Sequence, residues 1–143
     1  MPFVQTNWWS IEFPEEWSAE DEDGIVTLAD PDDIGALDIT AVIKEQGELS
    51  EEDVASLAQE NFPSDDEISE VMIGEAVGRY VDYVDDEGAW REWVLAERNV
   101  MLYVTYNCDV EDKGIDDAVV DQILQTLVIE SDEFQPDNDT ALD

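Results

Sequence analysis

The chain has 143 residues, of which 43% are hydrophobic, and this is enough apolar material for the core of one domain. It contains 40 acidic and only five basic residues, so its formal net charge at pH 7 is −35. Nucleic-acid backbones and anionic membranes bind clustered Lys and Arg, and this composition therefore argues against both as partners. The acidity suits solubility, adaptation to high salt, or attraction toward a basic protein surface.

Alternating apolar residues predict three short antiparallel strands in the first third of the chain. The first strand places three large side chains on one face: Trp9, Ile11 and Phe13. An acidic turn at residues 21–24 precedes the second strand, GIVTLAD, and another at residues 30–33 precedes the third, ALDITAVIK. The stretch WSIEFPEEW could also be an aromatic ligand site edged with carboxylates, but we interpret it as the opening strand of the fold.

Two helices are predicted, and the first begins at Ser50. The Ser50 side chain can accept a hydrogen bond from the Asp53 amide, and acids at residues 51–53 suit the N-terminal end of the helix dipole. Four apolar residues follow at helical spacing before Pro63 stops the run: Val54, Leu57, Ala58 and Phe62. The second helix is expected to start near Asp116 or Asp117, with an apolar face made of Ile115, Val119, Ile123, Leu124 and Leu127.

Between these helices the pattern predicts four more strands: ISEVMIGEA, GRYVDYV, AWREWVLAE and VMLYVTYNC. If residues 85–88 form a four-residue loop, Asp82 lies opposite Arg91. The same register pairs Val84 with Ala89, Tyr80 with Trp93 and Tyr83 with Trp90. A shift by one residue would place Asp82 opposite Glu92, and this like-charge pair favours the first register. The turn before the last strand is expected to use Asn99, because Asn tolerates a positive φ.

The domain organisation predicted from the chain is simple. Residues 1–129 are expected to form a single domain, and residues 130–143 an acidic, mobile tail. No run approaches the roughly 20 apolar residues that span a bilayer, and no basic and apolar leader follows Met1, so we expect a cytoplasmic protein. Three of the five bases lie close to the predicted hairpins and are expected to neutralise neighbouring acids: Arg79, Arg91 and Arg98.

The residues that usually carry catalysis or metal binding are scarce. The sequence has no histidine, which excludes Ser–His and Cys–His nucleophiles and imidazole metal sites. Cys108 has no adjacent base to lower the pKa of its thiol, and we interpret it as a structural residue. Carboxylate pairs are too frequent to identify a glycosidase-type acid and base. Neither DEDG nor DDEG fits an EF-hand loop, which leaves turn formation or weak cation binding. We therefore predict no catalytic residue, cofactor or metal site, and a protein that is not an enzyme.

The order of the predicted elements over residues 8–129 resembles the PsbP-like superfamily, which includes the yeast Ran-binding Mog protein. The motifs that carry the resemblance are Phe13-Pro14 with Trp17, Asp30-Pro31, and Leu127 near the end of the last helix. The resemblance implies an α+β fold, in which an antiparallel sheet of about six or seven strands is flanked by two main helices as an α/β/α sandwich. It also implies that the aromatic residues of WSIEFPEEW belong to the core. Proteins of this superfamily are mostly non-catalytic adaptors, photosystem accessory proteins or chaperones.

These observations favour a non-enzymatic binding module, an adaptor or chaperone toward a protein partner, and the acidic surface is able to attract a basic partner. A chaperone for a type VI secretion effector is a narrower alternative. A nucleic-acid mimic and an enzyme of unrecognised type are others. Any specific partner is expected to be held by aromatic anchors and steered by charge. Trp8 and Trp90 are the candidates for this contact, unless the helices cover both.

Overall fold

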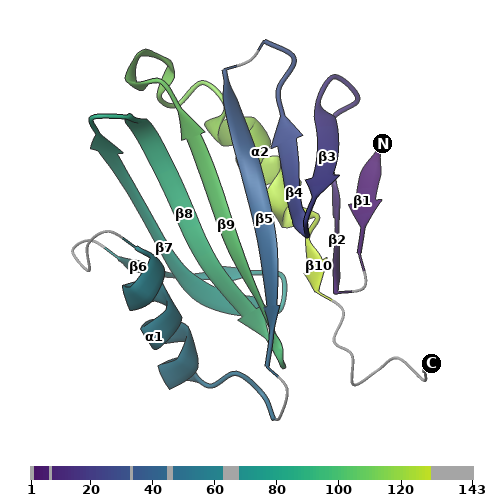
Figure 1. Ribbon diagram of the computed structural model, residues 1–143, viewed down its shortest axis with the longest axis vertical. Coiled ribbons are helices and arrows are strands. Elements are labelled where there is room, and N and C mark those ends of the chain that lie inside the picture. The colour runs from purple at the N-terminus through teal and green to yellow at the C-terminus, as the bar shows by residue number, and fades with distance from the viewer. Residues whose placement is uncertain (1, 7, 33, 45–46, 63–67, 130–143) are drawn as a thin grey trace.

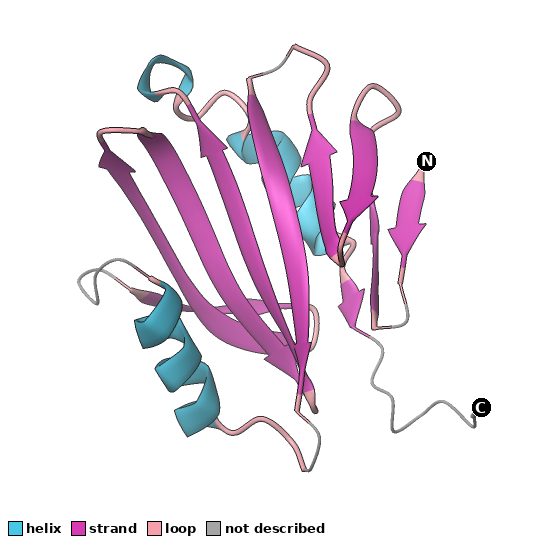
Figure 2. Cartoon of the chain, in the orientation of Figure 1, coloured by secondary structure: helices cyan, strands magenta, loops and turns pink. Residues whose placement is uncertain are grey.

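A computed structural model describes residues 2–6, 8–32, 34–44, 47–62 and 68–129. Within these residues the chain forms a seven-stranded antiparallel sheet, a three-stranded antiparallel sheet and two α-helices (Figures 1 and 2). The predicted α+β class is therefore confirmed. The predicted acidic tail at residues 130–143 lies outside the described residues, and its mobility stays a prediction.

The large sheet has the strand order β3 (Ser18–Glu22), β4 (Ile25–Ala29), β5 (Gly35–Ile43), β9 (Val100–Cys108), β8 (Gly88–Glu97), β7 (Ala76–Asp85) and β6 (Ser69–Ile73). The small sheet has the order β1 (Phe3–Gln5), β2 (Trp9–Glu12) and β10 (Val128–Ile129). The helices are α1 (Glu51–Asn61) and α2 (Asp117–Gln125), and a short 3₁₀ helix, Val110–Asp112, precedes α2.

Helix α1 starts as predicted, and the β7–β8 hairpin has the predicted register. Ser50 accepts a hydrogen bond from the Asp53 amide at 3.0 Å, and the Asp53 carboxylate accepts one from the Ser50 amide at 2.9 Å. In the β7–β8 hairpin Asp82 lies opposite Arg91, and the other three predicted pairs are also present. The hairpin is tighter than predicted, because Asp85 and Gly88 also pair and only two residues remain in the turn.

The prediction for the first third of the chain was wrong in its strand count and pairing. Strand β2 does not join the large sheet but pairs with β1 and β10 in the small one, which lies at the right of Figure 1. Strand β3 was not predicted, and its last two residues, Asp21 and Glu22, were assigned to the turn at residues 21–24; all five of its residues are exposed and polar or small, so they show no apolar alternation. Only Asp23 and Gly24 form the turn, with φ values of 54° and 87°.

Two smaller predictions also fail. In the turn between β8 and β9, Arg98 rather than Asn99 has the positive φ, at 58°. The Asn99 side chain instead donates a hydrogen bond to the Lys44 carbonyl, which is a tertiary contact between two distant segments of the chain. Ile115 was assigned to the apolar face of α2, but it precedes the helix and is exposed.

The large sheet buries apolar side chains on both faces, which follows from alternation along β8. Trp93 and Leu95 belong to the main core with α2 and the small sheet. Val94 and Ala96 belong to a second cluster with α1. The helices therefore lie on opposite faces, and the predicted α/β/α arrangement is confirmed, with the small sheet added to the α2 side. The main core contains the four apolar residues of WSIEFPEEW: Trp9, Ile11, Phe13 and Trp17.

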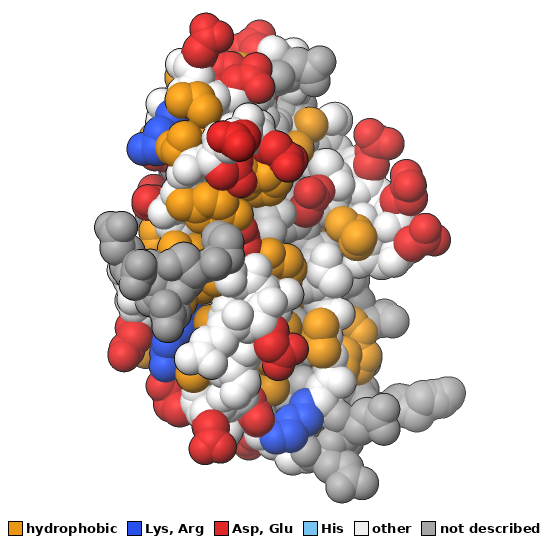
Figure 3. Space-filling view, turned by 60° about the vertical axis from the view of Figure 1, so that its left-hand side comes forward, with side chains coloured by type: hydrophobic (Ala, Val, Ile, Leu, Met, Phe, Trp, Pro, Cys, Tyr) orange, Lys and Arg blue, Asp and Glu red, His pale blue; other side chains and the backbone are white. Residues whose placement is uncertain are grey.

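Acidic side chains are spread over the surface, and apolar areas lie between them (Figure 3). The three bases expected to neutralise neighbouring acids do so. Arg79 contacts Glu51 of α1, at 3.1 Å, and Arg98 lies 4.0 Å from Glu97. Arg91 bonds to α2, as described below. Because so few bases are present, most of the acidic charge has no basic counterpart.

Candidate functional site

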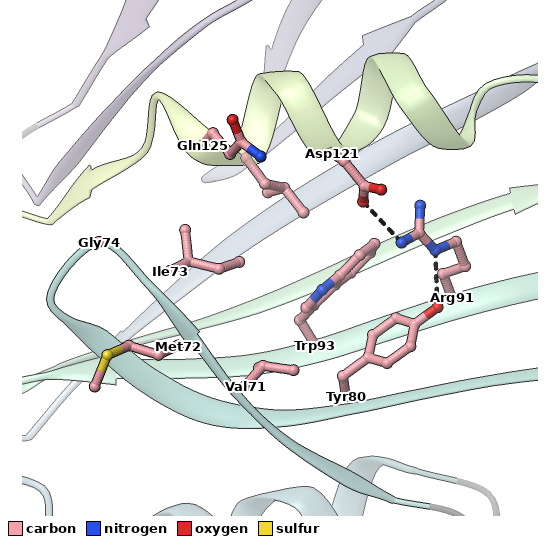
Figure 4. A pocket seen from close by; sticks show the side chains of 10 residues that line it. Val71, Met72, Ile73, Gly74, Tyr80, Arg91, Trp93, Asp121 and Gln125 are labelled. Carbon is pink, nitrogen blue, oxygen red and sulfur yellow. Dashed lines mark hydrogen bonds and ion pairs between the residues drawn. The ribbon is translucent and has the colours of Figure 1, made fainter.

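A cavity of about 440 Å³ opens between the β6–β7 hairpin and helix α2 (Figure 4). We call it the β6–α2 pocket. Strand β6 and the turn after it supply one wall, β7 and β8 supply the floor, and α2 supplies the opposite wall. Its lining residues are Val71, Met72, Ile73, Gly74, Tyr80, Arg91, Trp93, Asp121, Leu124 and Gln125.

Aromatic rings form the floor of the pocket. Tyr80 and Trp93 face each other across the β7–β8 pairing, with ring centroids 5.1 Å apart and planes tilted by 45°. Trp93 is almost wholly buried. Val71 and Ile73 of β6 add apolar side chains to the wall that faces α2, whereas the exposed Met72 side chain points to the other face of the strand. This floor and wall are suited to an apolar side chain, which would gain by leaving water.

Arg91 closes one end of the pocket and is held by several contacts. Its guanidinium lies over the rings of Trp93 and Tyr80, 4.8 and 5.4 Å from their centroids. It donates to the Tyr80 hydroxyl at 2.9 Å and to Asp121 at 2.8 Å, with Asp117 3.5 Å away. Burial opposes its charge, but the bonds to Tyr80 and Asp121 outweigh burial and raise its pKa. The Arg91 side chain is therefore held in place at this end of the pocket, and its positive charge is neutralised by the Asp121 carboxylate.

Tyr80 is not a proton donor or acceptor at neutral pH. Burial raises the pKa of Tyr80 to about 12, and its hydrogen bond to the Asp82 carboxylate acts in the same direction. Within the pocket lining, Arg91 thus bonds to both Tyr80 and Asp121. A general acid or base would need a carboxyl or hydroxyl with a pKa closer to neutrality.

A pair of carboxyls, Asp30 and Asp116, is buried on the same side of the sheet. Each is only 7% exposed, and their side chains are hydrogen-bonded to each other. Asp30 also accepts bonds from three backbone amides, those of Asp32, Ile34 and Gly35. Asp116 accepts a 2.6 Å bond from the Tyr106 hydroxyl. The pair ties the turn after β4 to the start of α2, which gives the Asp30-Pro31 motif a structural role.

The two carboxyls have opposite pKa shifts. Burial raises the pKa of Asp116 to about 6, and the neighbouring Asp30 carboxylate adds to the rise. Burial also acts on Asp30, but the bonds from Asp116 and the backbone amides outweigh it and lower its pKa. Asp116 therefore holds the shared proton in mildly acid solution. Sequence reasoning missed this pair, since nothing in the spacing of residues 30 and 116 brings them together.

Asp116→Asn is expected to stabilise the protein at about pH 8 by about 1–2 kcal/mol. The raised folded-state pKa of Asp116 means that the native state binds more protons than the unfolded state between about pH 4 and 6. Wild-type stability from this group is therefore present below about pH 4 and is lost as the pH rises through 6. An Asn keeps both hydrogen bonds without the negative charge. Urea titrations at several pH values check this, and a gain that is equal at every pH would contradict it.

A third buried acid, Glu92, lies on the α1 side of the sheet. It is 4% exposed and accepts hydrogen bonds from the hydroxyls of Tyr83 and Tyr103. Burial and the bond to Glu92 raise the pKa of both tyrosines. With its oxygens used by two phenols, Glu92 is a satisfied structural acid.

The two tryptophans predicted to contact a partner lie apart from the β6–α2 pocket. Trp8 precedes β2 and packs, half-buried, against the main core. Trp90 is also half-buried; it stacks on Tyr83 with 6.2 Å between centroids, and its indole donates to Asp85 at 2.9 Å. Trp90 alternates with Arg91 along β8, so its indole lies with Tyr83 on the α1 side of the sheet and the β6–α2 pocket lies on the other side. Their role in binding stays a prediction, and the residues that sequence reasoning missed are those of α2 and β6.

Cys108 and the DDEG turn match their structural interpretation. Burial raises the pKa of the Cys108 thiol, so the nucleophilic thiolate is disfavoured. In the DDEG turn, one oxygen of Asp85 accepts from the amides of Glu87 and Gly88 as well as from Trp90. This acid supports the turn. In the part of the chain that the structure describes, no group of three or more acids or cysteines is arranged to hold a metal ion.

Comparison with known proteins identifies the fold. No protein-family model and no curated protein sequence matches the chain. Among solved structures, the cyanobacterial PsbP protein (CyanoP) of Synechocystis matches over 90% of this chain and 92% of its own, with a TM-score of 0.60 and 10% identity. The fold is PsbP-like. This confirms the resemblance seen in the sequence motifs.

Two further structures share the PsbP-like fold. LpqN of Mycobacterium tuberculosis, which is involved in cell envelope biogenesis, matches 86% of this chain and 83% of its own, with a TM-score of 0.52 and 13% identity. A protein of Bacteroides thetaiotaomicron matches 88% of this chain with a TM-score of 0.67 and 20% identity, but this chain spans only 46% of it. Neither described helix is long and apolar enough to cross a bilayer.

Proposed function

We propose that this protein is a non-enzymatic binding module, an adaptor or chaperone that holds an apolar side chain of a protein partner in the β6–α2 pocket. The observation that carries the proposal is the aromatic floor formed by Tyr80 and Trp93 in an open cavity of about 440 Å³. Pockets of this size with an apolar floor and a few polar groups are typical ligand sites. A chaperone for a type VI secretion effector is a narrower form of the same proposal.

The polar groups of the pocket support binding better than catalysis. Arg91 is bonded to Tyr80 and Asp121, so its positive charge is already neutralised. The buried carboxyls Asp30 and Asp116 are bonded to each other and do not line the pocket. An apolar anchor gains by leaving water for the aromatic floor, and the bonded polar groups need no hydrogen-bond partner from it.

The acidic surface supports a steering role for charge. With a net charge of −35, the protein attracts a basic partner from a distance, and salt weakens this attraction. Charge spread over the surface does not define an orientation, which an anchor in the β6–α2 pocket would supply. Trp90, on the α1 side of the sheet, and Trp8 lie apart from the pocket and are secondary contacts in this proposal.

Gln125→Trp is expected to weaken partner binding by filling the pocket. Gln125 is exposed on the pocket wall, so an indole there occupies the cavity without entering the core. The matched control is Gln122→Trp, another exposed position on α2 that lies outside the pocket. Loss of an anchor contact at a hot spot weakens binding by about tenfold or more.

The measurement is quantitative mass spectrometry of proteins recovered from native extract by the wild type and both variants, at low and moderate salt. A partner that is lost with Gln125→Trp, retained with Gln122→Trp and retained at moderate salt would support the pocket. If partners are lost at moderate salt and are recovered equally by the wild type and both variants at low salt, charge alone is responsible for the binding.

A further inference from the structure

The two edges of the large sheet differ in chemistry. Strand β3, at one edge, carries three acids and no large apolar residue in its sequence SAEDE. Charged, exposed edge strands resist pairing with other chains. Strand β6, at the other edge, has the sequence SEVMI, with a single acid and three apolar residues. Among the described residues, no strand pairs with the outer edge of β6. Only one edge is therefore protected by its side chains.

The unprotected edge lies directly beside the β6–α2 pocket. Val71 and Ile73 lie opposite Gly78 and Ala76 of β7, and these positions share the face that carries Tyr80. Both line the pocket from β6, as Figure 4 shows. Across the pocket stands α2, with Gln125 exposed on the wall. The groove between an edge strand and a helix can receive an extended peptide, which pairs with the strand and directs alternate side chains into the groove.

We propose that the occupant of the β6–α2 pocket is an extended segment of the protein partner that adds to β6 as an eighth strand of the large sheet. Its apolar side chains, at alternate positions, enter the pocket, and Lys or Arg occupies the positions between them. This inference rests on the proposed function and specifies the form of the partner. Backbone hydrogen bonds to β6 supply part of the affinity, and the pocket supplies the preference for apolar side chains.

Charge complementarity selects the basic positions of the segment. Asp121 of α2 lines the pocket, and Glu75 follows the lining residue Gly74 in the turn after β6. Glu70 of β6 lies opposite Arg79 on the other face of the strand, where the positions between the apolar side chains of an added segment would lie. The base in the pocket lining, Arg91, is already bonded to Asp121. An acidic segment would therefore be repelled along the groove, whereas a basic segment is attracted.

The test uses a synthetic peptide with the full chain. The probe is an acetylated, amidated peptide of sequence KVKLKVK, with binding measured by calorimetry and amide protection in β6 by hydrogen exchange. Two matched peptides carry N-methyl groups, one on the apolar residues and one on the inner lysines. Successive amides of a strand point to opposite edges, so each modified peptide is blocked along one edge only. The charge and sequence of all three are the same.

Strand addition predicts that one of the modified peptides binds about tenfold or more weakly and that the other retains its affinity, because only one edge meets β6. The unmodified peptide should slow exchange of the β6 amides, and a peptide with Glu in place of Lys should not bind. Equal affinities for the two modified peptides, or no binding of the unmodified peptide at about 1 mM, would overturn the proposal.

The pocket variants separate this inference from the proposed function. If Gln125→Trp weakens peptide binding, Gln122→Trp does not, and N-methylation has no effect, the pocket binds apolar side chains but strand addition is wrong. If both variants bind the peptide with the affinity of the wild type, the pocket is not the binding site and both proposals fail.

Discussion

Gly78→Ala is expected to lower the free energy of unfolding by about 3 kcal/mol or more, or to prevent folding. A Cβ at Gly78 would lie 1.8 Å from the Val94 carbonyl oxygen, 2.8 Å from its carbon and 3.0 Å from the Leu95 Cα. These are backbone atoms of the central strand β8, which has partners on both sides and cannot move away. A glycine within a strand often marks such a close backbone approach.

The control for this substitution is Gly24→Ala. Gly24 has a φ of 87°, and a Cβ there would meet nothing within 4 Å, so only the left-handed backbone is strained. This should cost about 1–2 kcal/mol. Urea titrations of both variants give the comparison. If Gly78→Ala proves no more destabilising than Gly24→Ala, the close approach between β7 and β8 is not as described.

The Gly78 substitution also bears on the candidate site. Gly78 lies in β7 opposite Val71, which lines the β6–α2 pocket. A variant that still folds must displace the β6–β7 hairpin from β8, and it should therefore lose peptide binding even where its secondary structure is retained. Circular dichroism together with calorimetry would separate loss of folding from displacement of the hairpin.

Phe13→Ala is expected to destabilise the protein by roughly 3–5 kcal/mol. Phe13 follows β2 and is only 7% exposed within the main core. Truncation removes most of a ring from that core and leaves a cavity that the small sheet and α2 can close only in part. The expected effect is a large shift of the urea midpoint.

The matched control is Phe3→Ala, the same change on the neighbouring strand β1, where the ring is 63% exposed. Surface substitutions of this kind usually stay within about 0.5 kcal/mol. Equal midpoints for the two variants would overturn the structural interpretation of WSIEFPEEW and restore the alternative of an exposed aromatic ligand site.

Local patterns were sufficient for much of the fold. The β7–β8 register was predictable because a shift by one residue would have placed Asp82 opposite Glu92. The start of α1 was predictable because a Ser and an Asp three residues later can cap each other. Strand β3 was not predictable, since an edge strand with both faces exposed needs no apolar alternation.

The β6–α2 pocket was not predicted, although one part of it follows from the predicted register. The pairing of Tyr80 with Trp93 follows from the register, so the aromatic floor of the pocket was implied by the sequence. The walls were not, because β6 and α2 are separated by more than 40 residues and no local preference determines their distance. The same limit applied to Trp90, whose stacking on Tyr83 was implied but whose bond to Asp85 was not.

By itself, the sequence determined the charge, the lack of histidine chemistry, the strand and helix patterns, and the motifs of a PsbP-like fold. These depend on composition and on contacts between near neighbours in the chain. Only the tertiary structure decided that β2 belongs to a second sheet, that Asp30 and Asp116 share a buried site, and that a pocket opens beside β6. Those features arise where distant segments pack together, and the free energy of that packing depends on shape and burial over the whole core.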